Sequence, residues 1–138
     1  MGCGQYGRLM KPYTPAGLGD LAHPHIRSEL LAHLEDLSTV DPRGRWRIDR
    51  ARGLVVGVNQ AIHFFFDDNV FSDAEIGMSL LNADEVVLID AVKSALDPII
   101  DRIPYGSDDD FIAHPLWPTV TKAAAVAYDA IAVKPEVS

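Results

Sequence analysis

The sequence has little cysteine and no long hydrophobic run. Its one cysteine, Cys3, excludes an intramolecular disulfide and a zinc site built from several cysteines. No apolar run reaches the ~18 residues that a membrane-spanning helix needs, and the N-terminus has no apolar core of the kind that a secretory signal requires. We therefore expect a cytoplasmic protein in a reducing compartment, with no membrane association.

Basic residues are scarce in the second part of the chain. Residues 53–138 hold four Lys or Arg against fourteen Asp or Glu, whereas residues 1–52 hold eight against six, and the formal net charge is −8. This balance argues against general nucleic-acid binding, because phosphate backbones need clustered cations. An acidic surface suits solubility, or a basic protein partner reached by electrostatic steering.

With 138 residues and 48% hydrophobic residues, the chain is long and apolar enough for one domain with its own core. Residues 1–23 are rich in glycine and proline and show no lasting apolar period, which predicts an irregular N-terminal arm. We expect a single helical domain over residues 24–134. The predicted fold class is all-α, a bundle of four to five helices.

Apolar spacing and capping signals place most of these helices. Residues 26, 30, 34 and 37 are apolar, which predicts a helix from Pro24 that ends before the Asp41-Pro42 turn. SDAE at 72–75 has capping-box spacing and predicts a short helix through Leu81, and NADE at 82–85 predicts a cap for the next helix. That helix keeps its apolar phase across Pro98, which predicts one kinked helix ending at 104–106. Leu116, with apolar residues at 120, 123, 127 and 131, predicts the last helix.

The segment 54–68 fits two patterns. Its apolar residues match a helical face, and residues 54–66 also match the alternation of a strand. A lone strand cannot satisfy its backbone hydrogen bonds, so a helix is the prediction and an α+β fold with a short strand at 54–66 is the alternative.

Residues 43–52 contain five arginines, opposed only by Asp49. This density is typical of a patch for nucleic acid or an acidic ligand. The alternative, which we prefer, is that the arginines pair with carboxylates of the acidic second half. Trp46 is expected to anchor the segment on the core.

The stretch IHFFFDD at 62–68 holds the first candidate site. On a helix, His63 and Asp67 share a face, and with Asp68 they form the candidate catalytic set of an acid–base enzyme. For a metal, His63 and Asp67 would need a further ligand such as His114, because zinc takes three or four protein ligands. The structural alternative is an amphipathic helix end with solvated polar residues. We expect no cofactor.

A second candidate set is acidic and aromatic. Asp108, Asp109 and Asp110, together with Trp117, are the residues that we expect to bind a partner. The three aspartates also have a structural explanation, since acidic residues at a helix start interact favourably with the helix dipole.

The order of IHFFFDD, IGMSLL, ADEVVLIDAV and HPLWPTV resembles a family of small, uncharacterised, mainly actinobacterial proteins. That family has a histidine–aromatic–Asp-Asp stretch followed by a Pro-x-Trp-x-x-Val segment. The resemblance covers residues 54–131 and implies no particular activity. The chain is also similar in size and acidity to immunity proteins of bacterial toxin systems.

Three hypotheses of function follow. The first is a non-enzymatic interaction protein, of the immunity or regulatory type, that presents an acidic face to a basic protein. The second is a small metal-dependent or acid–base enzyme that uses His63, Asp67 and Asp68. The third is a self-associating scaffold, such as a homodimer, formed through Trp46, Trp117 and the alanine-rich last helix.

Overall fold

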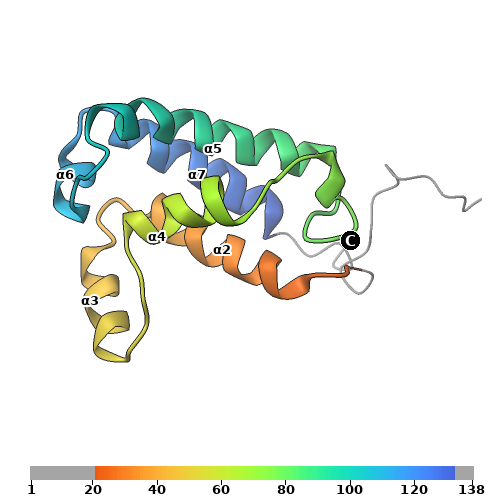
Figure 1. Cartoon of the computed structure of the whole chain (residues 1–138), viewed down its shortest axis with the longest axis horizontal. Coiled ribbons are helices and arrows are strands. Elements are labelled where there is room, and N and C mark those ends of the chain that lie inside the picture. The colour runs from red at the N-terminus through yellow and green to blue at the C-terminus, as the bar shows by residue number, and fades with distance from the viewer. Residues whose placement is uncertain (1–20, 133–138) are drawn as a thin grey trace, which may run out of the picture.

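The computed structural model describes residues 21–132, and this part of the chain is all-α (Figure 1). Its α-helices are α2 (Pro24–Ser38), α3 (Arg43–Ala51), α4 (Val58–Ile62), α5 (Ala83–Arg102), α6 (Asp108–Ala113) and α7 (Trp117–Ile131). A π-helix (His63–Asp68) continues α4, and a 3-10 helix (Asp73–Glu75) precedes α5. The all-α prediction is therefore confirmed. The described residues contain no strand, so the α+β alternative is wrong.

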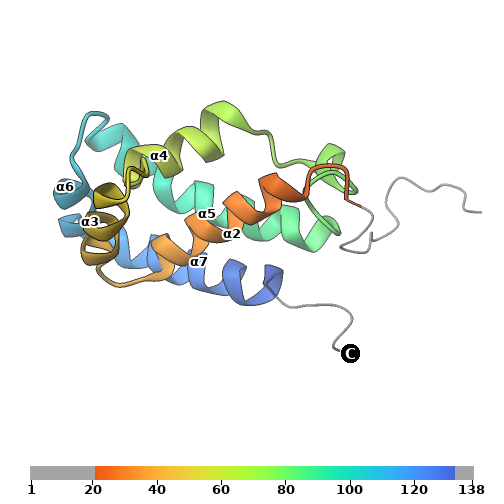
Figure 2. The same cartoon turned by 90° about the horizontal axis from the view of Figure 1, so that it is seen from below.

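Helix α7 packs against both α2 and α5. Figures 1 and 2 show these three long helices lying side by side. Helix α4 and the π-helix cover α2 and α5, whereas α3 and α6 lie together at one end. The core joins apolar side chains from all six α-helices. None of the helices within residues 21–132 is long and apolar enough to cross a membrane.

The long helices begin and end where the sequence predicts. Helix α2 has a proline in its first turn and ends at Ser38. The Asn82 side chain caps α5 by accepting a hydrogen bond from the Glu85 amide, and α5 runs through Pro98 as one helix. The last helix has Trp117, Val120, Ala124, Ala127 and Ile131 on its buried face.

The helix predicted over 72–81 does not form. Ser72 Oγ accepts from the amide of Ala74, and only three residues adopt a 3-10 turn. The Glu75 carboxylate accepts from Ser79 Oγ and does not reach back to the cap. Gly77 then takes φ +89°, a left-handed conformation that ends helical geometry. The chain turns here instead, and the Ala22 amide donates to the Gly77 carbonyl.

The segment 54–68 is helical only from Val58 onward. Gly57, with φ +130°, sets the boundary, and Leu54 and Val55 are exposed. Residues 21–132 form six α-helices, whereas four to five were expected. Helices α3 and α6 are additional to those that apolar spacing placed, and the helix predicted over 72–81 is missing. Trp46 anchors α3 as predicted: it is buried and its Nε1 donates to Asp36 at 3.0 Å.

The predicted N-terminal arm lies outside the described residues, except for Leu21–His23.

Candidate functional site

His63 and Asp67 are in contact, as their spacing predicts. His63 Nδ1 lies 2.6 Å from Asp67 Oδ2, and the two side chains are 59% and 60% exposed. Both belong to the π-helix, whose opposite face buries Phe64 and Phe65. Asp68 is also exposed. The pair can form a charge-assisted hydrogen bond at the surface, where solvent weakens its effect.

The candidate metal ligands do not assemble into a metal site. Among the described residues, no three His, Cys, Asp or Glu side chains gather closely enough to hold a metal ion. His114 has a different local role, because its Nδ1 accepts a hydrogen bond from the Leu116 amide at 3.1 Å. The structure thus brings His63 and Asp67 together without adding His114 to a metal cluster.

Asp108 links three helices. One oxygen accepts from Arg50 Nη2 of α3 at 2.7 Å, and the other accepts from the Val58 amide at the start of α4 at 2.9 Å. A Cβ on Gly57 would lie 3.0 Å from both Arg50 Nη2 and the Asp108 oxygens. Glycine is therefore required here both for its conformation and for the close approach of this ion pair.

Asp109 and Asp110 also have intramolecular partners. Asp109 pairs with Arg43 of α3 at 2.8 Å, and Asp110 forms a capping box with Ser107. The hypothesis that arginines of 43–52 pair with the acidic second half is confirmed for Arg43 and Arg50. The role of these aspartates in partner binding stays a prediction.

A buried ion pair that the sequence analysis missed ties the helices together. Arg27 donates to both carboxylate oxygens of Glu85 at 2.8 Å, and each side chain is 6% exposed. The guanidinium also donates to the carbonyls of Ser79 at 3.1 Å and Ile131 at 2.9 Å. Glu85 accepts from the Leu81 amide as well. We call this arrangement the Arg27 clasp.

The spacing of the clasp residues contains a signal for their burial. Arg27 precedes Leu30 and Leu34 by three and seven residues, so it lies on the apolar face of α2. Glu85 precedes Ile89 and Val92 by four and seven residues, in the same relation to the buried face of α5. A charged residue that continues an apolar stripe predicts a buried partner of opposite charge.

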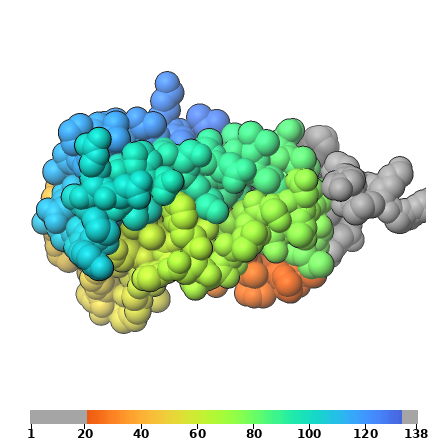
Figure 3. Space-filling view, turned by 45° about the horizontal axis from the view of Figure 1, so that its top comes forward, coloured from red at the N-terminus to blue at the C-terminus, as the bar shows by residue number. Residues whose placement is uncertain are grey.

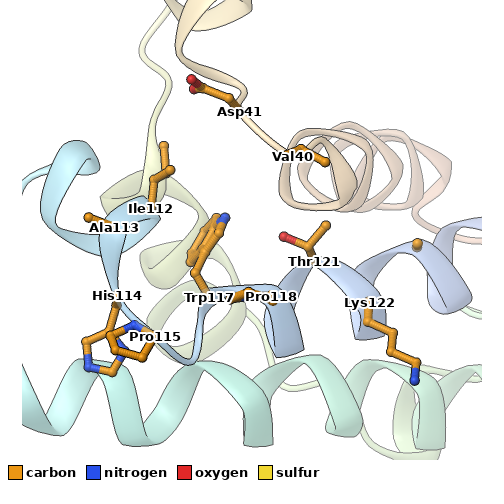
Figure 4. Close-up of a pocket in the computed structure, with 11 residues that line it drawn as sticks. Val40, Asp41, Ile112, Ala113, His114, Pro115, Trp117, Pro118, Thr121 and Lys122 are labelled. Atoms are coloured by element: carbon orange, nitrogen blue, oxygen red, sulfur yellow. The ribbon is translucent and has the colours of Figure 1, made fainter.

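Trp117 lies in an open groove of about 700 Å³ near α6, the Trp117 groove (Figure 4). Its walls come from three places: the α2–α3 connection, the end of α6 and the first turns of α7. The lining residues are Val40, Asp41, Ile112, Ala113, His114, Pro115, Trp117, Pro118, Thr121, Lys122 and Ala125. Trp117 is only 3% exposed, and no other residue within 21–132 forms a hydrogen bond with its Nε1.

A second groove of about 540 Å³ runs between α5 and α7, the α5–α7 groove. Its lining is largely apolar and contains small side chains. The lining residues are Leu88, Ala91, Ser94, Ala95, Thr119, Lys122, Ala123 and Val126. Val126 is 52% exposed, although it is hydrophobic. Lys122 lines both grooves, so the two grooves meet at this residue on the outward side of α7.

Three aspartates follow the exposed face of α5 beside this groove. Asp90, Asp97 and Asp101 are spaced by seven and four residues, so they share one side of the helix, and we call them the α5 acidic row. In the part of the chain that the structure describes, none of them forms an ion pair. Figure 3 shows α5 as a continuous band, from green to teal, along the surface.

Comparison with known proteins gives a family but no named relative. No curated protein and no solved structure matches the chain. One family model, described as "Domain of unknown function (DUF7945)", matches residues 21–138. The expectation of a family without an assigned activity is confirmed. The match covers the whole helical domain that the structure describes, and the chain belongs to the DUF7945 family.

Proposed function

We propose that the protein is a non-enzymatic interaction protein that binds a basic, amphipathic segment of a protein partner along α5. The α5 acidic row is the observation that carries the proposal. Carboxylates at 90, 97 and 101 repeat at helical spacing on an exposed face without an ion pair to another described residue. A surface of this kind attracts a basic partner and orients it during encounter.

The α5–α7 groove supplies the apolar half of the surface. Its walls contain Leu88 and Ala95 of α5 and Ala123 and Val126 of α7. Ser94 also lines the groove, and it lies four residues from Asp90 and three from Asp97, so the groove adjoins the acidic row. An amphipathic helix can place apolar side chains in such a groove while its basic side chains face the carboxylates. Small residues in the walls allow the backbone of a partner helix to come close.

The test compares two variants that change the formal charge equally. The test variant neutralises the acidic row: Asp90→Asn, Asp97→Asn and Asp101→Asn. The control neutralises exposed or half-exposed carboxylates elsewhere: Glu29→Gln, Asp49→Asn and Asp73→Asn. Each protein is used at low salt to capture partners from a lysate of the source cells, and each partner recovered is purified and its affinity measured.

The expected result is a partner that the wild type and the control bind and the test variant does not. Its affinity should fall as salt rises, because exposed charges beyond a Debye length are screened. Capture of the same partner by the test variant, or recovery of no partner at low salt, would contradict the proposal.

A small metal-dependent or acid–base enzyme is the second candidate, and one observation favours it. The 2.6 Å contact between His63 and Asp67 has the geometry of a histidine held by a carboxylate. Elemental analysis of the wild type and of His63→Ala tests the metal-dependent form, which requires a bound metal that the variant loses. Screening both proteins for hydrolase activity tests the acid–base form, which requires an activity that His63→Ala lacks.

A further inference from the structure

The Trp117 groove contains a buried hydrogen-bond donor without an acceptor. Trp117 Nε1 has no partner among the described residues, although the indole is 3% exposed. Figure 4 shows this nitrogen turned toward the side of the groove that Val40 and Asp41 form. The other tryptophan, Trp46, is buried to the same degree and donates to Asp36. An unsatisfied buried donor is rare and destabilising, so it calls for an explanation.

The rest of the lining indicates what kind of molecule would fit. Apolar side chains dominate, among them Ile112, Pro115 and Ala125. The volume of about 700 Å³ lies in the range of small-molecule sites. A ligand with an apolar or aromatic body therefore matches most of the surface.

The polar groups of the groove are mainly donors. Lys122 contributes an ammonium group and Thr121 a hydroxyl. His114 Nδ1 accepts from the Leu116 amide, so the neutral ring carries its proton on Nε2, which is a donor. The one acid, Asp41, is neutralised by Arg43 through side-chain contacts of 2.8 and 2.7 Å. A ligand that supplies acceptor oxygens and one negative charge fits this set.

We propose that the Trp117 groove binds a small apolar or aromatic monocarboxylate, with one carboxylate oxygen accepting the hydrogen bond from Trp117 Nε1. Lys122, which Figure 4 shows turned away from Trp117, adds a positive charge to the rim of the groove, and this charge attracts an anion more than an uncharged acceptor. The Trp117 groove shares only Lys122 with the α5–α7 groove and contains no residue of the α5 acidic row, so the inference does not rest on the proposed function.

The two indole N–H signals of the ¹⁵N-labelled full chain give a direct test. The signal of Trp117 is assigned by its loss in Trp117→Phe, and the signal of Trp46 serves as an internal reference. The probes are 3-phenylpropionate, 2-naphthoate and octanoate, each compared with its amide. We expect a saturable downfield shift of the Trp117 signal with at least one carboxylate, weaker binding of the amide, and no shift of the Trp46 signal.

Three variants locate the binding. Ala125→Leu fills the groove and should weaken binding by roughly tenfold or more, whereas Ala130→Leu adds the same side chain at an exposed position of α7 outside it. Lys122→Gln should weaken binding of the carboxylate and leave the amide unchanged. An unmoved Trp117 signal with all three probes would overturn the proposal. Equal binding by Ala125→Leu and the wild type would overturn it too.

Discussion

Arg27 and Glu85 meet side by side in the interior, with two parallel hydrogen bonds of 2.8 Å between guanidinium and carboxylate. They come from α2 and α5, which begin 59 residues apart in the chain. Every further contact of the clasp goes to a backbone group: the carbonyls of Ser79 and Ile131, and the amide of Leu81. One ion pair therefore connects α2, the turn before α5, α5 itself and the end of α7.

Removing one partner of the clasp should destabilise the protein strongly. Arg27→Met leaves the Glu85 carboxylate buried and without its counter-charge, which costs about 3–5 kcal/mol in comparable pairs. Urea denaturation measures the change in the free energy of unfolding. Arg45→Met breaks an exposed ion pair with Glu35 and a partly exposed one with Asp36, and should cost about 1 kcal/mol or less.

The double variant Arg27→Met/Glu85→Leu tests the origin of this cost. It removes both charges, so it should be more stable than Arg27→Met alone. A double variant at least as unstable as the single one would mean that the unpaired charge is not the main cause, and that the cost comes from lost packing and from the backbone groups that lose their partners.

Gly57→Ala should destabilise the protein by about 1–3 kcal/mol, since the backbone at this position has φ +130°, which residues with a side chain rarely adopt. The added methyl group would also press against Arg50 and Asp108, which lie 3.0 Å from its position. Gly53→Ala is the matched control, because Gly53 also has positive φ but has open space around it. Thermal unfolding should show the smaller loss for Gly53→Ala.

The pKa of Asp41 is lowered from 3.8 to about 2, mainly by hydrogen bonds from the side chain and the backbone amide of Arg43. Because the folded pKa is lower than the unfolded value of 3.8, the ionised Asp41 stabilises the folded state at pH values above 3.8. This contribution is lost as the pH falls toward 2. Arg43→Gln should return the pKa toward 3.8. NMR titration of the carboxyl carbon measures it, and an unchanged value in the variant would contradict this cause.

Burial lowers the pKa of His33 below 6.5, against the opposing influence of Asp36 and Glu29. The ring packs on Phe64, with centroids 4.6 Å apart. The unfolded chain therefore binds the proton more readily, so stability should decrease as the pH falls below 6.5 and level off below the folded pKa. His33→Phe should remove this part of the dependence in denaturation experiments at several pH values, whereas His25→Phe, at an exposed position, should retain it.

The sequence predicts the long helices because their signals are local. Apolar spacing defines α2, α5 and α7, together with a proline in the first turn of α2 and α7 and the Asn82 cap of α5, and the structure agrees with these signals. The prediction over 72–81 is wrong although its cap has suitable residues, since Gly77 adopts a backbone conformation that no helix continues. Capping signals indicate where a helix can start, and they say nothing about how far it runs.

The candidate site was predictable only where contacts are local. His63 and Asp67 are four residues apart, so their contact follows from helical spacing. The Trp117 groove combines residues from α7, α6 and the α2–α3 connection, which only the tertiary fold brings together. The partners of Asp108 belong to α3 and α4 for the same reason, and composition alone suggested merely that arginines and aspartates would pair.

The hydrogen bond from Arg27 Nη2 to the Ile131 carbonyl has a consequence for local motion. Terminal turns usually fray, so their amides exchange with solvent faster than those of the interior. Here the final carbonyl of α7 is held by a guanidinium that is itself fixed by Glu85. Protection of the amides in the last turn of α7 from hydrogen exchange should therefore approach that of the amides at the helix centre. Replacement of Arg27 should lower this protection to the level usual for a fraying helix end.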